Sequence, residues 1–118
     1  MSAYHQIFIR TTKAEGEIVD DITSASGAPL ERLAEKHNDI SFGGKAGGTI
    51  VEVEMSHDFE DEQDLQFESY PILVTIRNID SNKISEESAA RSIFEALQHI
   101  GGYHMILVFN LQRLLAQV

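Results

Sequence analysis

The sequence contains no cysteine, and this absence removes several kinds of chemistry at once. Without a thiol the chain has no disulfide bond, no thiolate metal site and no cysteine nucleophile. Small domains outside the cell often need crosslinks because their cores are small, so the absence also favours the cytoplasm. We therefore expect a cytoplasmic protein that is held together by its core alone.

Long apolar runs are also absent. The best candidate is the run from Met105 to Phe109, whereas a helix needs about 20 apolar residues to span a bilayer. The first residues, MSAYHQIFIRTT, lack the basic segment and the apolar block of a signal peptide. The sequence thus predicts a soluble chain without a membrane segment.

Basic residues are scarce, since nine lysines and arginines stand against 19 aspartates and glutamates, for a formal net charge of −10. Binding of nucleic acid depends on basic side chains that replace the counterions of the phosphates. Anionic membrane surfaces attract basic segments for a similar reason. The charge therefore argues against nucleic acid and against membranes as partners, and it suits a basic protein partner.

The negative charge is concentrated in one part of the chain. Residues 46–76 contain eight acidic residues and no lysine or arginine, whereas residues 1–45 carry a formal charge of −2 and residues 77–118 a charge of zero. The eight acidic residues are Glu52, Glu54, Asp58, Glu60, Asp61, Glu62, Asp64 and Glu68. This asymmetry is the most informative feature of the sequence.

The composition suits one ordinary hydrophobic core. The chain has 118 residues, of which 42% are hydrophobic, and single domains commonly have about 100–150 residues. No linker, internal repeat or low-complexity tract divides it. We expect a single α+β domain over residues 1–118.

Five segments have the composition or the alternation of β-strands. They are residues 4–11, 40–42, 49–55, 71–78 and 103–109. Alternate residues on one face of three of these strands are His5, Ile7 and Ile9, then Val51, Val53 and Met55, then Ile72, Val74 and Ile76. The last segment is apolar on both faces from Met105 on, so we place it inside the sheet.

Two shorter segments are less regular. Residues 30–34 suit either a helical turn or a short edge strand, and the strand is our prediction. The glycine-rich residues 43–48 (GGKAGG) favour a flexible hairpin connection.

Two segments have the apolar spacing of amphipathic helices. The two stripes are Ala14, Ile18, Ile22 and Ala25, ending near Gly27, and Ala89, Ile93, Leu97 and Ile100, ending at Gly101. Thr12 and Glu15 fit a capping box at the start of the first helix, and Ser85 fits the N-cap of the second. Asn110 fits the cap of a short third helix that would carry Leu111, Leu114 and Leu115.

The expected order of elements is β-α-β-β-β-β-α-β-α. Two main helices and strands that mostly neighbour each other in sequence favour a two-layer α+β sandwich. In this architecture a mostly antiparallel sheet carries both main helices on one face. The specific prediction is a ferredoxin-like variant with an added hairpin.

The acidic residues 56–69 (SHDFEDEQDLQFES) first suggest a calcium site. An EF-hand loop needs glycine at its sixth position and glutamate at its twelfth. Counted from Asp58, these positions are Gln63 and Ser69, so the pattern fails. We predict a solvated loop or a partner-binding surface, without a metal or a cofactor.

His57 and Asp58 are the best candidates for an acid–base or zinc-binding pair, and they define an alternative hypothesis, a small metal-dependent or small-molecule enzyme. Zinc sites usually contain two ligands at short spacing, such as HxxxH. No two histidines here lie within four residues of each other; the others are His5, His37, His99 and His104. The GGKAGG segment also lacks the serine or threonine that follows the lysine of a phosphate loop. We find no catalytic constellation and predict a protein that is not an enzyme.

Three aromatic residues lie in or beside the acidic segment, namely Phe59, Phe67 and Tyr70. Phe67 and Tyr70 suit anchors that pin the segment to the core. Apolar anchors among carboxylates are also typical of a surface that binds a basic protein. The predicted partner-binding residues are Glu52, Glu54, Asp58, Phe59, Glu60, Asp61, Glu62 and Asp64.

With these features the chain resembles the small acidic immunity proteins of bacterial toxin systems, including those of contact-dependent inhibition. The segments that carry the resemblance are AYHQIFIRTT, the DFEDEQD loop before SYPILVTIRN, and EESAARSIFEALQHIGG. The resemblance implies a stoichiometric inhibitor that binds a basic toxin domain, often a nuclease, and covers its active site. A third hypothesis is a structural or regulatory homo-oligomer whose acidic segment only maintains solubility.

Overall fold

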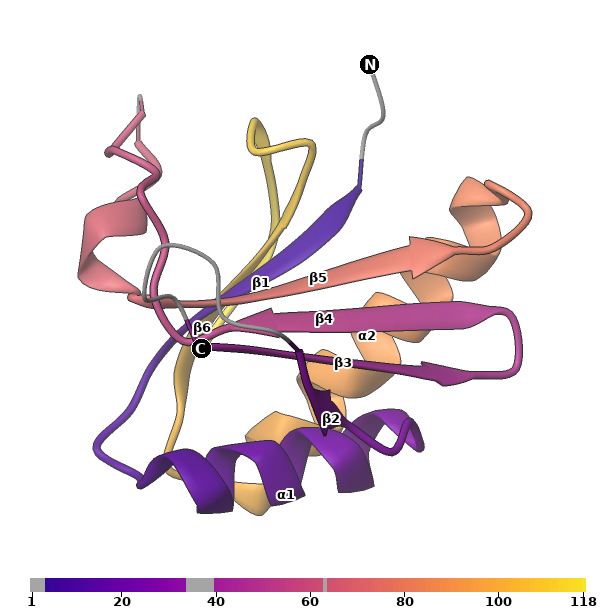
Figure 1. Ribbon diagram of the computed structural model, residues 1–118. Coiled ribbons are helices and arrows are strands. Elements are labelled where there is room, and N and C mark those ends of the chain that lie inside the picture. Colours follow the sequence, from indigo (N-terminus) through magenta and orange to yellow (C-terminus); the bar gives the residue numbers. More distant parts are fainter. Residues whose placement is uncertain (1–3, 34–39, 63) are drawn as a thin grey trace.

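The computed structural model describes residues 4–33, 40–62 and 64–118 (Figure 1). Two positions weighed above therefore lie outside the described residues, His37 and Gln63, as does the last residue of the segment 30–34. The described helices are α1 (Glu15–Ser26) and α2 (Lys83–Ile100), with a 3-10 turn η1 (Phe67–Ser69). The described strands are β1 (His5–Arg10), β2 (Glu31–Arg32), β3 (Ser41–Ala46), β4 (Thr49–Glu54), β5 (Ile72–Asn78), β6 (His104–Phe109) and β7 (Arg113–Gln117).

The strands form one antiparallel sheet in the order β2-β3-β4-β5-β1-β6-β7. The four inner strands β4-β5-β1-β6, with one helix after β1 and one after β5, have the order of a ferredoxin-like fold. β3 forms a hairpin with β4 at one side, and β7 extends the sheet at the other. The predicted α+β sandwich with an added hairpin is confirmed.

Both helices pack on the same face of the sheet, where the main core lies. Ile18 and Ile22 of α1 and Leu97 of α2 are buried there. The strand residues in this core include Ile7, Ile9, Val51, Val53, Ile72, Val74, Ile76, Met105 and Leu107. Because each fully buried aliphatic side chain contributes about 1.5–3 kcal/mol, this face supplies most of the stability of the fold.

The opposite face of the sheet has a second, smaller core. Phe8 of β1 is fully buried there together with Ile106 and Val108 of β6 and Leu73 of β5. The residues that cover them are Leu65, Phe67 and Tyr70, all from the connection between β4 and β5. The prediction that Phe67 and Tyr70 pin the acidic segment to the core is thus confirmed.

The helix starts differ from the predicted ones. α1 begins after Ala14, which provides no side-chain cap, so the capping box at Thr12 is wrong. Thr11 organises this turn instead: its Oγ1 accepts a hydrogen bond from the Lys13 amide at 3.2 Å and donates one to the Gly102 carbonyl at 2.7 Å. The turn is therefore held by a distant segment, which a local capping pattern does not include.

α2 begins two residues before the predicted cap. Asn82 is its N-cap, and the Asn82 side chain accepts the amides of Ile84 and Ser85. The prediction of Ser85 as the cap is therefore wrong. Ile100, placed on the buried stripe of this helix, is 42% exposed.

The predicted third helix does not form. Asn110 and Leu111 both have positive φ angles, of 55° and 58°, and the Gln112 amide donates to the Phe109 carbonyl at 3.1 Å. Two consecutive positive φ angles produce a tight hairpin turn that matches the twist of the strands. The chain therefore returns as β7, and Leu111 packs against the second core.

The glycine-rich segment is mostly strand. β3 extends to Ala46, so only Gly47 and Gly48 form the connection to β4. At Gly44 a Cβ atom would lie 2.6 Å from the carbonyl oxygen of Pro29, which leaves no room for a side chain. The short strand predicted within residues 30–34 is present as β2. Neither described helix is long and apolar enough to cross a membrane.

Candidate protein-binding surface

Residues 56–69, which we call the acidic loop, connect β4 to β5. Figure 1 shows this connection at the upper left, where it extends beyond the strands and carries the turn η1. Leu65 and Phe67 of the loop are buried in the second core, whereas the described acidic residues of the loop are exposed. The acidic loop is thus a cover for one face of the sheet, and its outer surface is negative.

Hydrogen bonds between main chain and carboxylates fix the base of this loop. The Asp61 amide donates to Glu68 Oε2 at 3.2 Å, and the Glu68 amide donates to Asp61 Oδ1 at 2.9 Å. Farther out, Glu62 and Leu65 exchange two main-chain hydrogen bonds of 2.9 and 3.0 Å. The described residues of the loop therefore have a defined conformation.

His57 holds the first half of the loop. Its Nδ1 accepts the Phe59 amide at 3.1 Å, so its proton lies on Nε2, which donates to the Tyr70 carbonyl at 2.6 Å. Its ring also packs edge-on against Phe8, with 5.0 Å between ring centroids. Both ring nitrogens are engaged, so the predicted alternative of an acid–base pair with Asp58 has no free imidazole nitrogen.

Phe59 is the exposed aromatic residue of the loop. Its side chain is 40% exposed although its ring lies 6.1 Å from that of Phe8, 6.4 Å from that of Phe67 and 5.7 Å from that of His57. The Phe59 ring therefore packs against these three rings and remains partly exposed to solvent. A rigid aromatic side chain in this position is suited to insertion into a partner.

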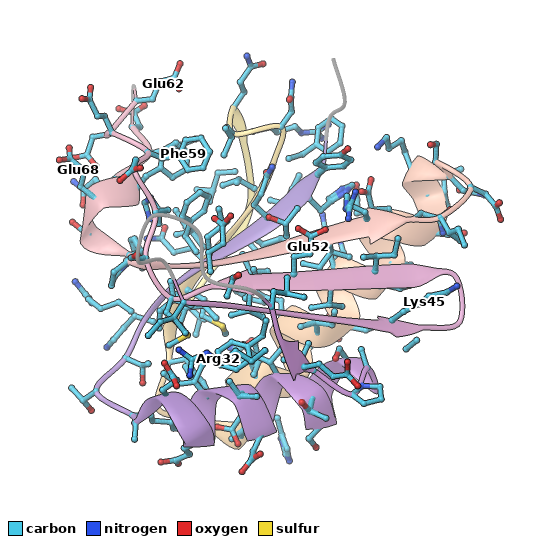
Figure 2. The ribbon with its side chains drawn as sticks, viewed as in Figure 1. Arg32, Lys45, Glu52, Phe59, Glu62 and Glu68 are labelled. Carbon is cyan, nitrogen blue, oxygen red and sulfur yellow. The ribbon has the colours of Figure 1, made fainter. Side chains whose placement is uncertain are left out.

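Four acidic residues of the loop have exposed side chains that hold no ion pair within the described structure. These residues are Asp58, Glu60, Glu62 and Asp64. A hollow of about 410 Å³ lies among His57, Asp58, Phe59, Glu60 and Glu68. In Figure 2 Phe59, Glu62 and Glu68 lie together at the same end of the molecule.

The two predicted site residues of β4 are in a different setting. Glu52 and Glu54 are on the outward face of the strand, as predicted, but Glu52 forms an ion pair with Arg77 of β5. Figure 2 shows Glu52 over the middle of the sheet, and the residue lines one hollow together with Phe59 of the acidic loop. The structure therefore brings six of the eight predicted residues together on the loop and places the other two beside it on the sheet.

Metal ligation needs several ligand side chains in one place. Among residues 4–33, 40–62 and 64–118, no group of three histidine, aspartate or glutamate side chains is arranged to hold a metal ion. The two ring nitrogens of His57 bind the Tyr70 carbonyl and the Phe59 amide.

A polar cluster that the sequence analysis missed lies between α1 and the segment before β6. Asp21 accepts hydrogen bonds from the Tyr103 hydroxyl and from Lys13 Nζ, the latter at 2.9 Å, and Lys13 lies 4.2 Å above the Tyr103 ring. Burial alone raises the pKa of the Asp21 carboxyl, but these hydrogen bonds and the charge of Lys13 outweigh it and leave the pKa below its ordinary value. Burial and the Asp21 carboxylate raise the pKa of Tyr103. The cluster ties α1 to the segment before β6.

A second missed feature is the contact between His5 and Glu86. Both residues are 1% exposed, and His5 Nδ1 lies 3.2 Å from a Glu86 carboxylate oxygen, which Lys83 also approaches to 3.1 Å. Glu87, 3.6 Å from His5, has its pKa lowered chiefly by a hydrogen bond from Arg91. The alternation of β1 placed His5 on the core face, but its partner lies 81 residues later in the chain.

The chain was compared with protein-family models, with curated proteins and with solved structures, and no match was found in any of the three.

Proposed function

We propose that this protein is a non-enzymatic inhibitor that binds a basic protein through its acidic loop. The partner class we favour is a basic bacterial toxin domain, with this chain as its cytoplasmic immunity protein. In this role the protein binds in equal stoichiometry and covers the active site of its partner. Carboxylates that replace the phosphates of a nucleic acid substrate suit a nuclease in particular.

The observation that carries the proposal is the combination of fixed backbone and free charge in the acidic loop. Asp61, Glu68 and His57 hold its main chain by hydrogen bonds, while Asp58, Glu60, Glu62 and Asp64 remain exposed without an ion-pair partner among the described residues. A surface that is ordered before binding loses less conformational entropy on association. This argument supports a binding role, because nothing in the described fold requires four exposed carboxylates here.

Two physical effects would operate in such binding. The field of the loop would steer a cationic partner and raise the association rate by roughly ten- to a thousandfold. After encounter, the Phe59 ring would become buried at the centre of the contact, surrounded by charge pairs. Steering thus determines the rate, and Phe59 contributes to the lifetime of the complex.

The test uses a variant in which the four free carboxylates become amides. We call it the loop variant, and its changes are Asp58→Asn, Glu60→Gln, Glu62→Gln and Asp64→Asn. Asp61 and Glu68 are left unchanged because they hold the main chain. The matched control variant has the same charge change on exposed residues outside the loop, namely Glu15→Gln, Asp20→Asn, Asp80→Asn and Glu95→Gln.

The partner to be tried is the protein encoded by the neighbouring reading frame. If that protein has a basic toxin domain, we expect the wild type and the control variant to bind it and abolish its activity, and the loop variant to do so much less. Light scattering should show one copy of each protein in the complex. Equal inhibition by the loop variant, or a stable homo-oligomer that ignores the basic domain, would contradict the proposal.

A further inference from the structure

The sheet has a strand at each edge, and an edge strand presents main-chain N–H and C=O groups to further pairing. Proteins commonly shield such an edge by keeping the strand short or by placing charged residues on it. β2 is shielded in both ways, since it consists of Glu31 and Arg32 alone. β7 has five residues with an uncharged run of Leu114, Leu115 and Ala116, and no described segment pairs with its outer side. β7 is therefore the edge that is open to another strand.

The main-chain groups of Gln117 point outward from this edge. Val118 and Met105 exchange two main-chain hydrogen bonds, of 3.0 and 3.1 Å. Along an antiparallel ladder such bonded pairs alternate with pairs that share no hydrogen bond, and the next pair is Gln117 and Ile106. The N–H and C=O of Gln117 are thus directed away from β6. One residue of an added antiparallel strand can exchange two hydrogen bonds with them.

A hollow of about 210 Å³ lies between β7 and the acidic loop. Its lining includes Leu65, Tyr70, Ile106, Leu114 and Gln117. A bulge in the pairing of β6 with β7 brings Leu114 and Gln117 to this one face, although they lie three positions apart. Directly opposed residues of an antiparallel pair have their side chains on the same face. A residue paired with Gln117 therefore projects its side chain toward the hollow, where an apolar group would cover Leu114, which is 46% exposed.

The charge beside this edge favours a basic segment. Asp64 lines the same hollow, and Glu62 lines a neighbouring one of about 290 Å³; Leu65 lines both. Both carboxylates are exposed, and neither forms an ion pair with a described residue. Figure 1 shows the hairpin of β6 and β7 (yellow) extending to the same side of the sheet as the acidic loop. A second copy of this chain, with its net charge of −10, would be repelled here, so the favoured occupant is a segment of a basic protein.

We propose that an extended segment of the basic partner adds to the sheet beside β7 as a further, antiparallel strand. The residue opposite Gln117 is apolar and fills the hollow, and a basic residue two positions away, on the same face, pairs with Asp64. In strand addition the main-chain hydrogen bonds supply affinity and the alternate side chains supply specificity. The inference rests on the proposed function, since it names the segment by which the partner docks beside the acidic loop.

The experiment is a nuclear magnetic resonance titration of the ¹⁵N-labelled full chain with blocked heptapeptides. The test peptide is Thr-Lys-Thr-Val-Thr-Lys-Thr, in which the valine and both lysines share one face of a strand. We expect saturable shifts at the amides of Leu65, Leu114 and Gln117, and slower hydrogen exchange at the Gln117 amide.

Two control peptides separate the main-chain and the charge contributions. An N-methyl group on the valine removes the donor to the Gln117 carbonyl and should weaken binding by about tenfold. Glutamate in place of both lysines should weaken binding through repulsion by Glu62 and Asp64.

Two variants at one position separate the main chain from the side chain. Gln117→Pro removes the outward N–H without removing a hydrogen bond to β6, and proline is tolerated on an edge strand where the N–H faces solvent. It should weaken binding of the test peptide by about two- to tenfold, whereas Gln117→Ala keeps the N–H and should bind like the wild type. Asp64→Asn should weaken binding by up to about fivefold, and its matched control Asp80→Asn should not. If Gln117→Pro fails to fold, the N-methylated peptide tests the same hydrogen-bonded pair on the unchanged protein.

Three results would overturn the inference: no saturable shift at β7, equal binding of the test peptide and either control peptide, or a stable homodimer in which the Gln117 amide is already protected from exchange. Toxin inhibition separates this inference from the proposed function. If the test peptide adds to β7 but the wild type inhibits no basic toxin, the strand assignment holds and the proposed function fails. If the wild type inhibits a basic toxin and Gln117→Pro inhibits it equally well, the function holds and the strand assignment fails.

Discussion

Asp61 and Glu68 each bind the main-chain amide of the other through a side-chain carboxylate. The two residues have like charges and lie seven positions apart, yet both carboxylates are directed inward to the backbone. They close the base of the acidic loop and leave the four other acidic residues between 58 and 64 directed to solvent. The acidic residues of the loop thus have two roles. Asp61 and Glu68 fix its conformation, and the other four produce its negative electrostatic field.

Replacing Asp61 with alanine tests the first role. The Glu68 amide would lose its acceptor, and we expect the base of the loop to be destabilised by about 1–2 kcal/mol, as is usual for a hydrogen bond to a charged group. Hydrogen exchange at the Glu68 amide should become faster by roughly five- to thirtyfold, the factor that corresponds to this free energy. Asp64→Ala, at an exposed residue without a partner among the described side chains, is the control and should leave this amide unchanged.

The N-cap of α2 can be assigned by comparing variants of Asn82, the observed cap, and Ser85, the predicted cap. Asn82→Ala should lower the free energy of unfolding by about 1 kcal/mol, because the Ile84 and Ser85 amides both lose their acceptor. Ser85→Ala should change it by no more than about 0.5 kcal/mol. Urea denaturation of the two variants measures both values, and a larger loss at Ser85 would contradict the assigned start of the helix.

The two glycines Gly16 and Gly44 should respond in opposite directions to alanine. At Gly44 the new Cβ would meet the Pro29 carbonyl, so we expect a loss of about 1–3 kcal/mol. At Gly16, inside α1, no atom lies within 4 Å of the new Cβ, and alanine should stabilise by about 0.5–1 kcal/mol. Thermal denaturation compares the two, and a Gly44→Ala variant as stable as the wild type would disprove the close approach.

Asp21 should make stability depend on acid pH. Although burial raises the pKa of its carboxyl, the hydrogen bonds from Tyr103 and Lys13 bring it below the value of 3.8 that an unperturbed aspartate has. A lowered pKa in the folded state means that the contribution of Asp21 is complete above about pH 4 and is lost as the pH falls through the folded-state pKa. The free energies of unfolding of the wild type and of Asp21→Asn should therefore differ at pH 6. This difference should shrink as the pH falls through the folded-state pKa of Asp21. A difference that stays constant over this range would contradict the ionised cluster.

Tyr103 should make stability depend on alkaline pH. Burial and the Asp21 carboxylate raise the pKa of Tyr103 above its ordinary value of 10.0, so its contribution is complete below pH 10 and is lost as the pH rises through the folded-state pKa. Tyr103→Phe should thus be less stable than the wild type near neutral pH, with a difference that shrinks only above pH 10. Stability measured by urea denaturation from pH 7 to 11 checks this order.

The regular parts of the fold were predictable because burial imposes a period on the sequence. The alternation in β1, β4 and β5 and the stripes of α1 and α2 follow from one face of each element being buried. β7 was not predictable in this way, because Leu114 and Leu115 are adjacent and suit a helix as well as a strand. The turn at Asn110 and Leu111 decides between them, and it depends on pairing with β6.

The candidate site was predictable in composition but not in arrangement. The run of acidic residues indicated a negative surface, and the aromatic residues indicated anchors. Sequence alone did not show that Asp61 and Glu68 bind the backbone, nor that Arg77 neutralises Glu52. The latter pair is diagonal across β4 and β5, since Ile50 is opposite Arg77 and Glu52 is opposite Thr75. Such contacts depend on the register of strands, which is set by tertiary structure.

The central claim is that the free carboxylates of the acidic loop attract a cationic partner. The most direct measurement is the association rate constant with the basic domain, determined over a range of salt concentration for the wild type, the loop variant and the control variant. We expect the loop variant to associate at least about tenfold more slowly at low salt and to lose most of the salt dependence, while the control variant behaves like the wild type. Equal rates and equal salt dependence for the loop and control variants would contradict the account.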